Sequence, residues 1–201
     1  KNGKKVIQNE SGANLVNGIA ATLLLNTNHS GKITADYAIF EVDENALPKL
    51  LTELTPDYLL LLNLFRDQLD RYGEVNTIAK NWKAMLEKLP EKTKRIFNAD
   101  DPQIAFLGLA KEKSSATYFG LEGKEKKNQI IPHAADSVSC PKCGEKLIFS
   151  SITFSHLGIW HCPKCTLKRP TPNVTKLETY PLPGVYNEYN SLAAEIVLEQ
   201  I

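Results

Sequence analysis

The sequence predicts an α/β fold in which a mostly parallel sheet forms the middle of three layers, with a metal-binding ribbon inserted in it. Two observations lead to this prediction. Short apolar runs alternate with longer helix-like segments, a pattern typical of parallel strands that are covered by helices on both faces. All four cysteines lie in two CPKC pairs late in the chain, where that alternation is interrupted. Paired cysteines of this kind are typical of zinc sites.

The expected strands are short and rich in apolar side chains, and they cover residues 6–8, 36–42, 57–63, 94–98 and 116–120. Helices are expected at 12–25, at 44–54 with Pro48 near the first turn, at 75–89, and from Pro102, behind a potential N-cap at Asp101. A final helix is expected to begin at Asn187 or Asn190, after a Pro-Gly turn. The helix at 75–89 is amphipathic, and its apolar side carries Ile78, Trp82, Met85, Leu86 and Leu89.

The alternation of strands and helices breaks near Leu121 and ends in a clear helix after Pro170. We therefore expect one α/β domain in two parts, residues 1–136 and 170–201, interrupted by a ribbon at 137–169. Both ends of the sequence fall inside element-like patterns, so we expect the chain to be one domain of a longer protein.

Composition narrows the possible functions. The 201 residues carry a formal net charge of +1, which gives no bulk electrostatic reason to expect a polyanionic partner. The longest apolar run, Ile104 to Ala110, is far too short to cross a bilayer, and no secretory segment opens the sequence. Two CxxC pairs without a signal peptide favour a bound metal in a reducing, cytoplasmic compartment over disulfides.

The cysteines are spaced C-x2-C-x18-C-x2-C, which suits a tetrahedral zinc ion. Four thiolates leave no open position for substrate, so we expect the zinc to be structural rather than catalytic. His156 and His161 lie nearby, but the four cysteines already fill the coordination shell, and we do not expect either histidine to be a ligand. The predicted ligands are Cys140, Cys143, Cys162 and Cys165.

A nucleic-acid-binding ribbon is the alternative from a different class. Basic residues surround the cysteines, and Phe149, Phe154 and Trp160 lie between them. A small ribbon also needs those aromatic side chains as its only core, and we favour this structural interpretation. The basic residues are Lys142, Lys146, Lys164, Lys168 and Arg169.

Polar clusters follow three of the expected strands, at the carboxyl ends where parallel sheets build their sites. The first is "FEVDE", with Glu41, Asp43 and Glu44; the second is "NLFRDQLDRYGE"; the third is "NADDP". Carboxylates at such positions often bind Mg²⁺. The structural alternative for "FEVDE" is a solvated helix start, and for "NADDP" it is an N-cap followed by proline at N1.

Two of these segments, "NADDP" and "DQLDRYGE", and a third near the end of the sequence, "LPGVYNEYNSLAA", together resemble the central ATPase domain of the Mur ligases, which build the peptide of bacterial cell-wall precursors. "SGANLVNGIAATLL" and "FRDQLDRYGE" resemble the MurT branch in particular, which carries a four-cysteine zinc ribbon in this domain. The resemblance covers nearly the whole chain. It implies the Mur ligase ATPase fold, and use of ATP and Mg²⁺.

The resemblance also implies roles for individual residues. Glu41 matches the Mg²⁺-binding glutamate of the family, and Asp67 and Arg71 lie in the segment that matches its DHLDR motif. Asn190 matches the asparagine that binds the adenine of ATP, and Asn187 supports it. The loop that faces the phosphates and the acceptor matches Ser11, Gly12, Ala13 and Asn14.

The sequence departs from the family pattern in three places. "NGK" at 2–4 is followed by Lys5 rather than Ser or Thr, so we expect the phosphate-binding loop to lie upstream of this sequence. Gln68 stands where the family has a histidine, although its amide oxygen can still bind Mg²⁺ or a water of its shell. Many members carry a carbamoylated lysine in this region, and Lys80 and Lys83 are the local candidates, although both also fit solvated helix positions.

The function that the resemblance implies is amidation of the D-glutamate α-carboxylate of lipid II, through an acyl phosphate and with ammonia from a GatD-like glutaminase partner. No cysteine outside the two pairs is left to be a glutaminase nucleophile. Alternatives are a Mur-like ligase that adds an amino acid, an inactive scaffold subunit, or the nucleic-acid-binding ribbon.

Overall fold

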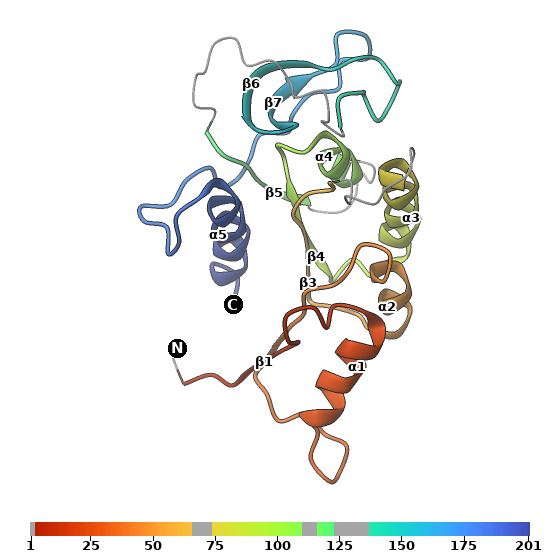
Figure 1. Cartoon of the computed structure of the whole chain (residues 1–201), viewed down its shortest axis with the longest axis vertical. Helices are drawn as coiled ribbons and strands as arrows, with labels where there is room; N and C mark the ends of the chain where they lie inside the picture. The colour runs from red at the N-terminus through yellow and green to blue at the C-terminus, as the bar shows by residue number, and fades with distance from the viewer. Residues whose placement is uncertain (1–2, 66–73, 110–115, 123–136) are drawn as a thin grey trace. The chain divides into compact units, whose positions relative to one another are not determined.

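The computed structural model describes residues 3–65, 74–109, 116–122 and 137–201. The chain divides into two compact units, Lys1–Thr55 and Pro56–Ile201, and each is described by itself. Figure 1 shows the first unit in red to orange and the second from amber through yellow and green to blue. Among the described residues, we find no helix with the length and apolar character that crossing a membrane requires.

The first unit contains a two-stranded parallel ladder. Strand β1 (Val6–Gln8) pairs with β2 (Tyr37–Ile39), with Val6 opposite Tyr37. Helix α1 (Val16–Leu25) joins the two strands, and α2 (Leu47–Glu53) follows with proline in its first turn, as predicted. The sequence pattern predicts strands covered by helices on both faces, and β2 departs from it, because Ile39 is 61% exposed at the edge of a ladder with a single partner strand.

The second unit is built on a three-stranded parallel sheet in the order β3-β4-β5. These strands are β3 (Tyr58–Leu61), β4 (Lys94–Asn98) and β5 (Ala116–Phe119). Three helices accompany them: α3 (Glu74–Lys88), α4 (Pro102–Leu109) and α5 (Val185–Leu198). The predicted α/β class with parallel pairing is therefore confirmed, with the strands divided between the two units.

Alternate side chains of the sheet pack against different helices, as period-two strands require. Ile96 and Phe119 join Tyr189 and Leu192 of α5 in one buried cluster, whereas Phe97 faces Gly108 of α4. Figure 1 shows α5 on one side of this sheet, with α3 and α4 on the other. The predicted apolar side of α3 is also confirmed, since each of its five residues is less than 10% exposed: Ile78, Trp82, Met85, Leu86 and Leu89.

The chain leaves this sheet after β5 and later returns to its edge. Val174 forms a parallel bridge with Phe119, and the Asn173 N–H donates to the Tyr118 carbonyl at 2.7 Å. Between these points lies the antiparallel hairpin of β6 (Ile148–Phe154) and β7 (Leu157–His161). This path agrees with a ribbon interrupting an α/β domain, although its limits at 137 and 169 stay a prediction.

Helix α5 begins earlier than predicted, at Val185. Gly184 is the N-cap, with φ of 105°, a left-handed conformation that favours glycine. The Asn187 side chain lies within the first turn, where its Nδ2 donates to the Pro183 carbonyl at 2.7 Å. Asparagine is a frequent N-cap, but here a glycine precedes the helix and Asn187 holds the turn before it.

Candidate functional site

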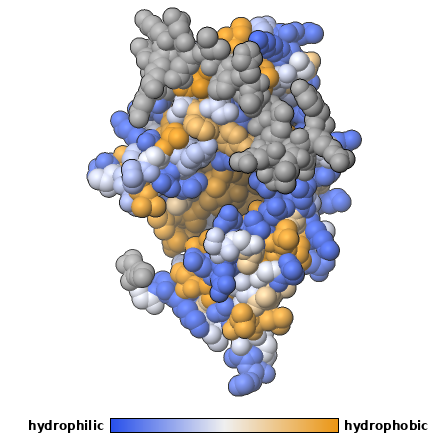
Figure 2. Space-filling model, in the orientation of Figure 1, coloured by the Kyte–Doolittle hydropathy of each residue, from blue (hydrophilic) through white to orange (hydrophobic). Residues whose placement is uncertain are grey.

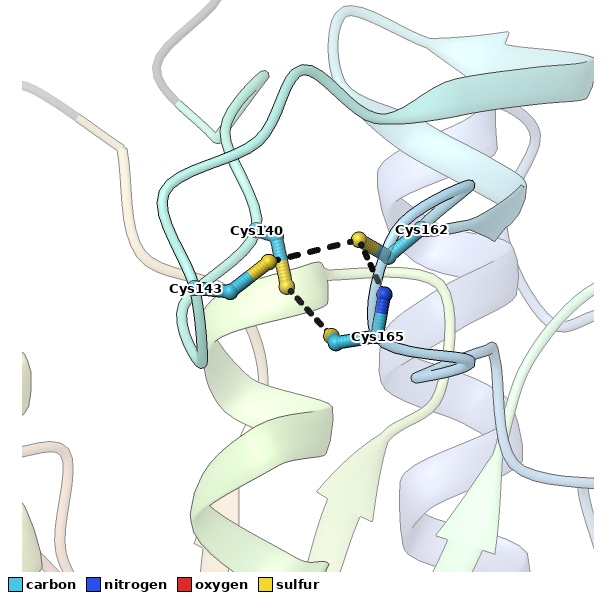
Figure 3. A group of neighbouring side chains, drawn as sticks. All are labelled: Cys140, Cys143, Cys162 and Cys165. Carbon is cyan, nitrogen blue, oxygen red and sulfur yellow. Dashed lines mark hydrogen bonds between the residues drawn. The ribbon is translucent and has the colours of Figure 1, made fainter.

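The four cysteine sulfurs meet at one point of the second unit. Figure 3 shows Cys140 and Cys143 on the loop before β6, and Cys162 and Cys165 on the loop after β7, with their sulfurs pointing toward one another. All four Sγ atoms lie within 4.8 Å of one another, and two of the pairs are 3.5 Å apart. Tetrahedral zinc with bonds of about 2.3 Å places its sulfurs about 3.8 Å apart. The cluster therefore fits a closed zinc site.

Each CPKC pair forms the same turn. The N–H of its first cysteine donates across the turn, from Cys140 to the Glu145 carbonyl and from Cys162 to the Leu167 carbonyl, both at 2.7 Å. The residue after each pair has a left-handed backbone, with φ of 76° at Gly144 and 63° at Thr166. In the first turn this position is a glycine, which the left-handed conformation favours. In the second turn it is Thr166, whose β-branched side chain makes the same conformation strained.

This difference predicts opposite effects of two substitutions. Thr166→Gly should raise the free energy of unfolding of the zinc-loaded protein by about 0.5–1 kcal/mol, because it relieves the left-handed strain. Gly144→Thr should lower it by about 1–2 kcal/mol. A Cβ at Gly144 meets nothing within 4 Å, so the cost comes from the backbone alone. Thermal unfolding measures both changes, and equal destabilisation by the two variants would contradict the strain at Thr166.

Backbone N–H groups favour the thiolate at several of these sulfurs, but at Cys162 they prevail over burial. Burial works against ionisation of Cys162, but the backbone N–H groups of Cys165 and Lys164 overcome it and lower the pKa of Cys162 to about 6. At Cys140 burial dominates and raises the pKa to about 12 in the metal-free site. A cation at the centre of the cluster supplies the positive charge that four thiolates need.

The ribbon packs on the sheet through a small apolar core. Cys140, Leu147 and Trp160 are buried against Ala105 of α4, and the Trp160 Nε1–H donates to the Ala99 carbonyl at 3.1 Å. The interpretation of this aromatic side chain as core is therefore confirmed. The lysines remain on the surface, and Figure 2 shows hydrophilic residues at the upper right, over the ribbon. The exposed lysines are Lys142, Lys146, Lys164 and Lys168.

Two buried aspartates in "NADDP" join the ribbon to the α/β part, and the second of them, Asp101, caps α4. Its Oδ1 accepts from the N–H groups of Gln103 and Ile104, as the N-cap prediction requires. Its Oδ2 accepts from the Leu64 N–H after β3, at 2.8 Å, and lies 3.3 Å from Nε2 of His156. His156, fully buried in the turn between β6 and β7, is thus a structural contact, as expected for a residue that is not a zinc ligand.

Asp100 lies at the centre of a second buried contact. Its Oδ1 accepts from Nε of Arg169 at 2.6 Å, and its Oδ2 accepts from the Tyr189 hydroxyl at 2.7 Å and from the Leu121 N–H at 3.0 Å. Burial raises the pKa of Asp100, and the Arg169 guanidinium works against that rise. Three donors that converge on one carboxyl group are the arrangement that stabilises its ionised form.

These contacts assign a structural role to the two aspartates of "NADDP". Both carboxylates are fully buried and hydrogen-bonded to protein, so they hold structure rather than face a ligand. The sequence did not identify Arg169, Tyr189 or His156 as their partners. From the sequence alone, an arginine at the end of a metal-binding ribbon is expected to face solvent. The structure shows instead that Arg169 contacts the buried Asp100.

In the first unit the structure places Glu41 beside the loop that contains Ser11 and Asn14. The Asn9 side chain exchanges two hydrogen bonds with the backbone of Glu41, at 2.9 and 3.0 Å, and also donates to the Ala13 carbonyl. The Asp43 N–H donates to the Asn14 carbonyl at 3.0 Å. Sequence reasoning missed Asn9, which fastens the loop to the end of β2.

The exposed side chains in this region are available to a ligand. Glu41 and Ser11 are exposed, and Asn14 is half-buried. Asp43 instead turns inward, and its Oδ1 accepts from the N–H groups of Asn45 and Ala46 ahead of α2. Asp43 therefore holds the turn ahead of α2, whose N-cap is Ala46 without a side-chain cap, and the Mg²⁺-binding role of Glu41 stays a prediction.

The remaining candidate residues belong to the second unit. Asn187 is half-buried in the first turn of α5, and Asn190 is exposed one turn further on, on the same side of the helix. Asp67, Gln68 and Arg71 lie outside the described residues.

The family model of the Mur ligase middle domain matches residues 3–198. The chain belongs to the Mur ligase family. The fold class, the parallel strands and the order of motifs predicted from the sequence agree with this membership. Family membership implies use of ATP and Mg²⁺, and the four-cysteine cluster is compatible with zinc.

Curated relatives of this Mur ligase domain have one name in common. The "Lipid II isoglutaminyl synthase (glutamine-hydrolyzing) subunit MurT" of Staphylococcus aureus (strain COL) is 30% identical over all of this chain and 47% of its own length. The subunit of the same name from Streptococcus pneumoniae (strain ATCC BAA-255 / R6) is 31% identical over 94% of this chain and 45% of its own. The chain thus spans about half the length of the curated relatives it matches.

A solved structure supports the fold alone. The pseudomurein peptide ligase type C from Methanothermus fervidus superposes with a TM-score of 0.68, over 98% of this chain and 41% of that one, at 23% identity. The likeness confirms a Mur ligase-like α/β arrangement.

Proposed function

We propose that the protein is the ligase subunit of a lipid II isoglutaminyl synthase, which converts the D-glutamate α-carboxylate of lipid II to the amide of D-isoglutamine. The observation that carries this proposal is the similarity to MurT subunits along the whole chain, at about 30% identity in two bacteria. The proposed reaction belongs to peptidoglycan synthesis, and we place it on the cytoplasmic side of the membrane, where the lipid-linked precursor and ATP meet.

The reaction proceeds by transfer of the γ-phosphoryl group of ATP to an oxygen of the carboxylate, with ADP as leaving group. Ammonia then attacks the acyl phosphate carbon, and phosphate departs with the carboxylate oxygen. Bound Mg²⁺ neutralises charge on the phosphates. Glu41 is the proposed ligand of this ion, because its carboxylate is exposed at a strand end whose backbone Asn9 fixes.

The other proposed site residues bind the nucleotide and the acceptor. Asn190 and Asn187 bind and support the adenine, and Ser11 and Asn14 face the phosphates from the loop beside Glu41. Asp67 and Arg71 act near the metal in this proposal. The zinc ribbon, with Cys140, Cys143, Cys162 and Cys165, is closed and therefore structural.

A glutaminase partner supplies the ammonia in this proposal. The sequence has four cysteines, and all of them belong to the metal cluster. A cysteine nucleophile for glutamine hydrolysis therefore lies outside this domain, and we assign it to a GatD-like subunit.

Amide formation on lipid II tests the proposal. The full-length protein, alone and with its glutaminase partner, is incubated with lipid II, ATP and Mg²⁺, and with either glutamine or an ammonium salt. We expect ammonium to support amidation without the partner and glutamine to support it only with the partner, and mass spectrometry of the stem peptide detects the product. Attachment of an amino acid in place of an amide, or no ATP-dependent product with ammonium, would overturn the proposal.

A further inference from the structure

Two tyrosines in the first two turns of α5 contact the ribbon and Asp100, and each directly precedes one of the candidate asparagines. The sequence here is "YNEYN", with Tyr186 before Asn187 and Tyr189 before Asn190. Successive helix residues point about 100° apart, so Tyr189 can face the protein while Asn190 faces solvent. Tyr186 is 49% exposed, and Asn187 beside it is half-buried. Tyr189 is 1% exposed, whereas Asn190 is exposed.

Tyr189 is fixed by a buried, charge-assisted hydrogen bond. Its hydroxyl donates to Oδ2 of Asp100 at 2.7 Å, and the other oxygen of that carboxylate accepts from Arg169 at the end of the ribbon. The guanidinium also donates to the Leu121 carbonyl at 3.0 Å. Gly120 lies directly beside this contact, and a Cβ there would collide with the Asp100 carboxylate. The aspartate is therefore closely packed on this side.

Tyr186 gives the ribbon a second contact with α5. Its ring lies edge-on to that of Phe154, at the end of β6, with centroids 4.8 Å apart. Leu157 of β7 is fully buried in the cluster that contains Leu192 and Ala193 of α5. The hairpin of the ribbon therefore packs directly on the helix that carries the asparagines.

We propose that the ribbon and Asp100 are positioning elements for the nucleotide site: through Tyr186 and Tyr189 they fix the part of α5 that presents Asn187 and Asn190, and thereby set the affinity for ATP. This inference rests on the proposed function, which assigns the two asparagines to the adenine. It gives the zinc ribbon a place in catalysis without any contact between zinc and substrate.

The Tyr189→Phe variant of the full-length protein with its glutaminase partner tests this inference, because it removes a hydroxyl and keeps the ring. We expect the KM for ATP to rise about tenfold, with kcat and the KM for lipid II changed less than about twofold. Phe154→Ala removes the contact of the ribbon with Tyr186 and should also raise the KM for ATP. Tyr118→Phe is the matched control, since this other buried tyrosine donates to the Ala105 carbonyl on the opposite face of the sheet and should leave the KM for ATP unchanged.

A binding measurement separates this inference from the proposed reaction. Affinities for ATP and GTP carrying a fluorophore on the ribose are compared, with no lipid II present. Tyr189→Phe should weaken ATP binding about tenfold and reduce the preference for ATP over GTP, and it should add less than about twofold in an Asn190→Ala background. Wild-type affinity and base preference in Tyr189→Phe would overturn the inference even if amidation is observed. Failure of the wild type to amidate lipid II would instead overturn the proposed reaction.

Discussion

The Cys140→Ser variant is expected to lose its metal and to lower the free energy of unfolding of the protein by about 4 kcal/mol or more. Cys140 is 3% exposed, and its sulfur lies among the other three. Serine is a far poorer zinc ligand than a thiolate and leaves a buried hydroxyl in a core where Trp160 and Leu147 pack. Because a ribbon of this size has little other core, the metal supplies much of its folding free energy.

Metal content by atomic emission and thermal unfolding measure this result. The matched control is His161→Ala, which removes an exposed potential ligand next to Cys162 and should keep one zinc ion per chain. A Cys140→Ser protein that retains its zinc and unfolds at the wild-type temperature would show that the four-cysteine cluster is not the metal site. Loss of zinc by His161→Ala would show that the ligand set is wrong.

Glu41→Gln is expected to reduce kcat for ATP-dependent amidation by about a hundredfold or more while the protein stays folded. The substitution removes one negative charge from the proposed Mg²⁺ site and preserves the size of the side chain. The hydrogen bonds of this position to Asn9 use the backbone of residue 41, so they survive the change.

The control for Glu41→Gln is Glu53→Gln, the same change of charge at the end of α2 in the same unit. It should have the wild-type kcat, and both variants should unfold at the wild-type temperature. Turnover of Glu41→Gln within about threefold of wild type would remove Glu41 from the metal site. The dependence of the rate on Mg²⁺ concentration adds a second readout, and it should shift to higher concentrations for Glu41→Gln only.

Features that depend on neighbours in the sequence could be predicted. The four cysteines lie in two local turns that form the same hydrogen bonds, so the spacing of each pair in the sequence predicts the geometry of its turn. The same holds for Asp101, whose capping partners are two and three residues away. The amphipathic side of α3 was likewise visible, because a helix repeats its buried positions every three to four residues.

Features that depend on distant residues could not be predicted in this way. Asp100 bonds to Arg169 and Tyr189, which are 69 and 89 positions away in the chain. In the sequence each of these residues has an ordinary local explanation: an aspartate before a helix, an arginine near a ribbon, and a tyrosine on a helix face. Their common burial follows from the ribbon folding back onto the sheet, which no spacing in the sequence encodes.

The central claim is that this Mur ligase domain works in an enzyme that activates a carboxylate as an acyl phosphate before ammonia attacks it. The most direct measurement uses lipid II whose D-glutamate α-carboxylate carries heavy oxygen, incubated with the full-length protein, ATP, Mg²⁺ and ammonium. The account predicts that the released inorganic phosphate contains one heavy oxygen for each amide formed. Amide formation with unlabelled phosphate, or with the label in AMP, would contradict it.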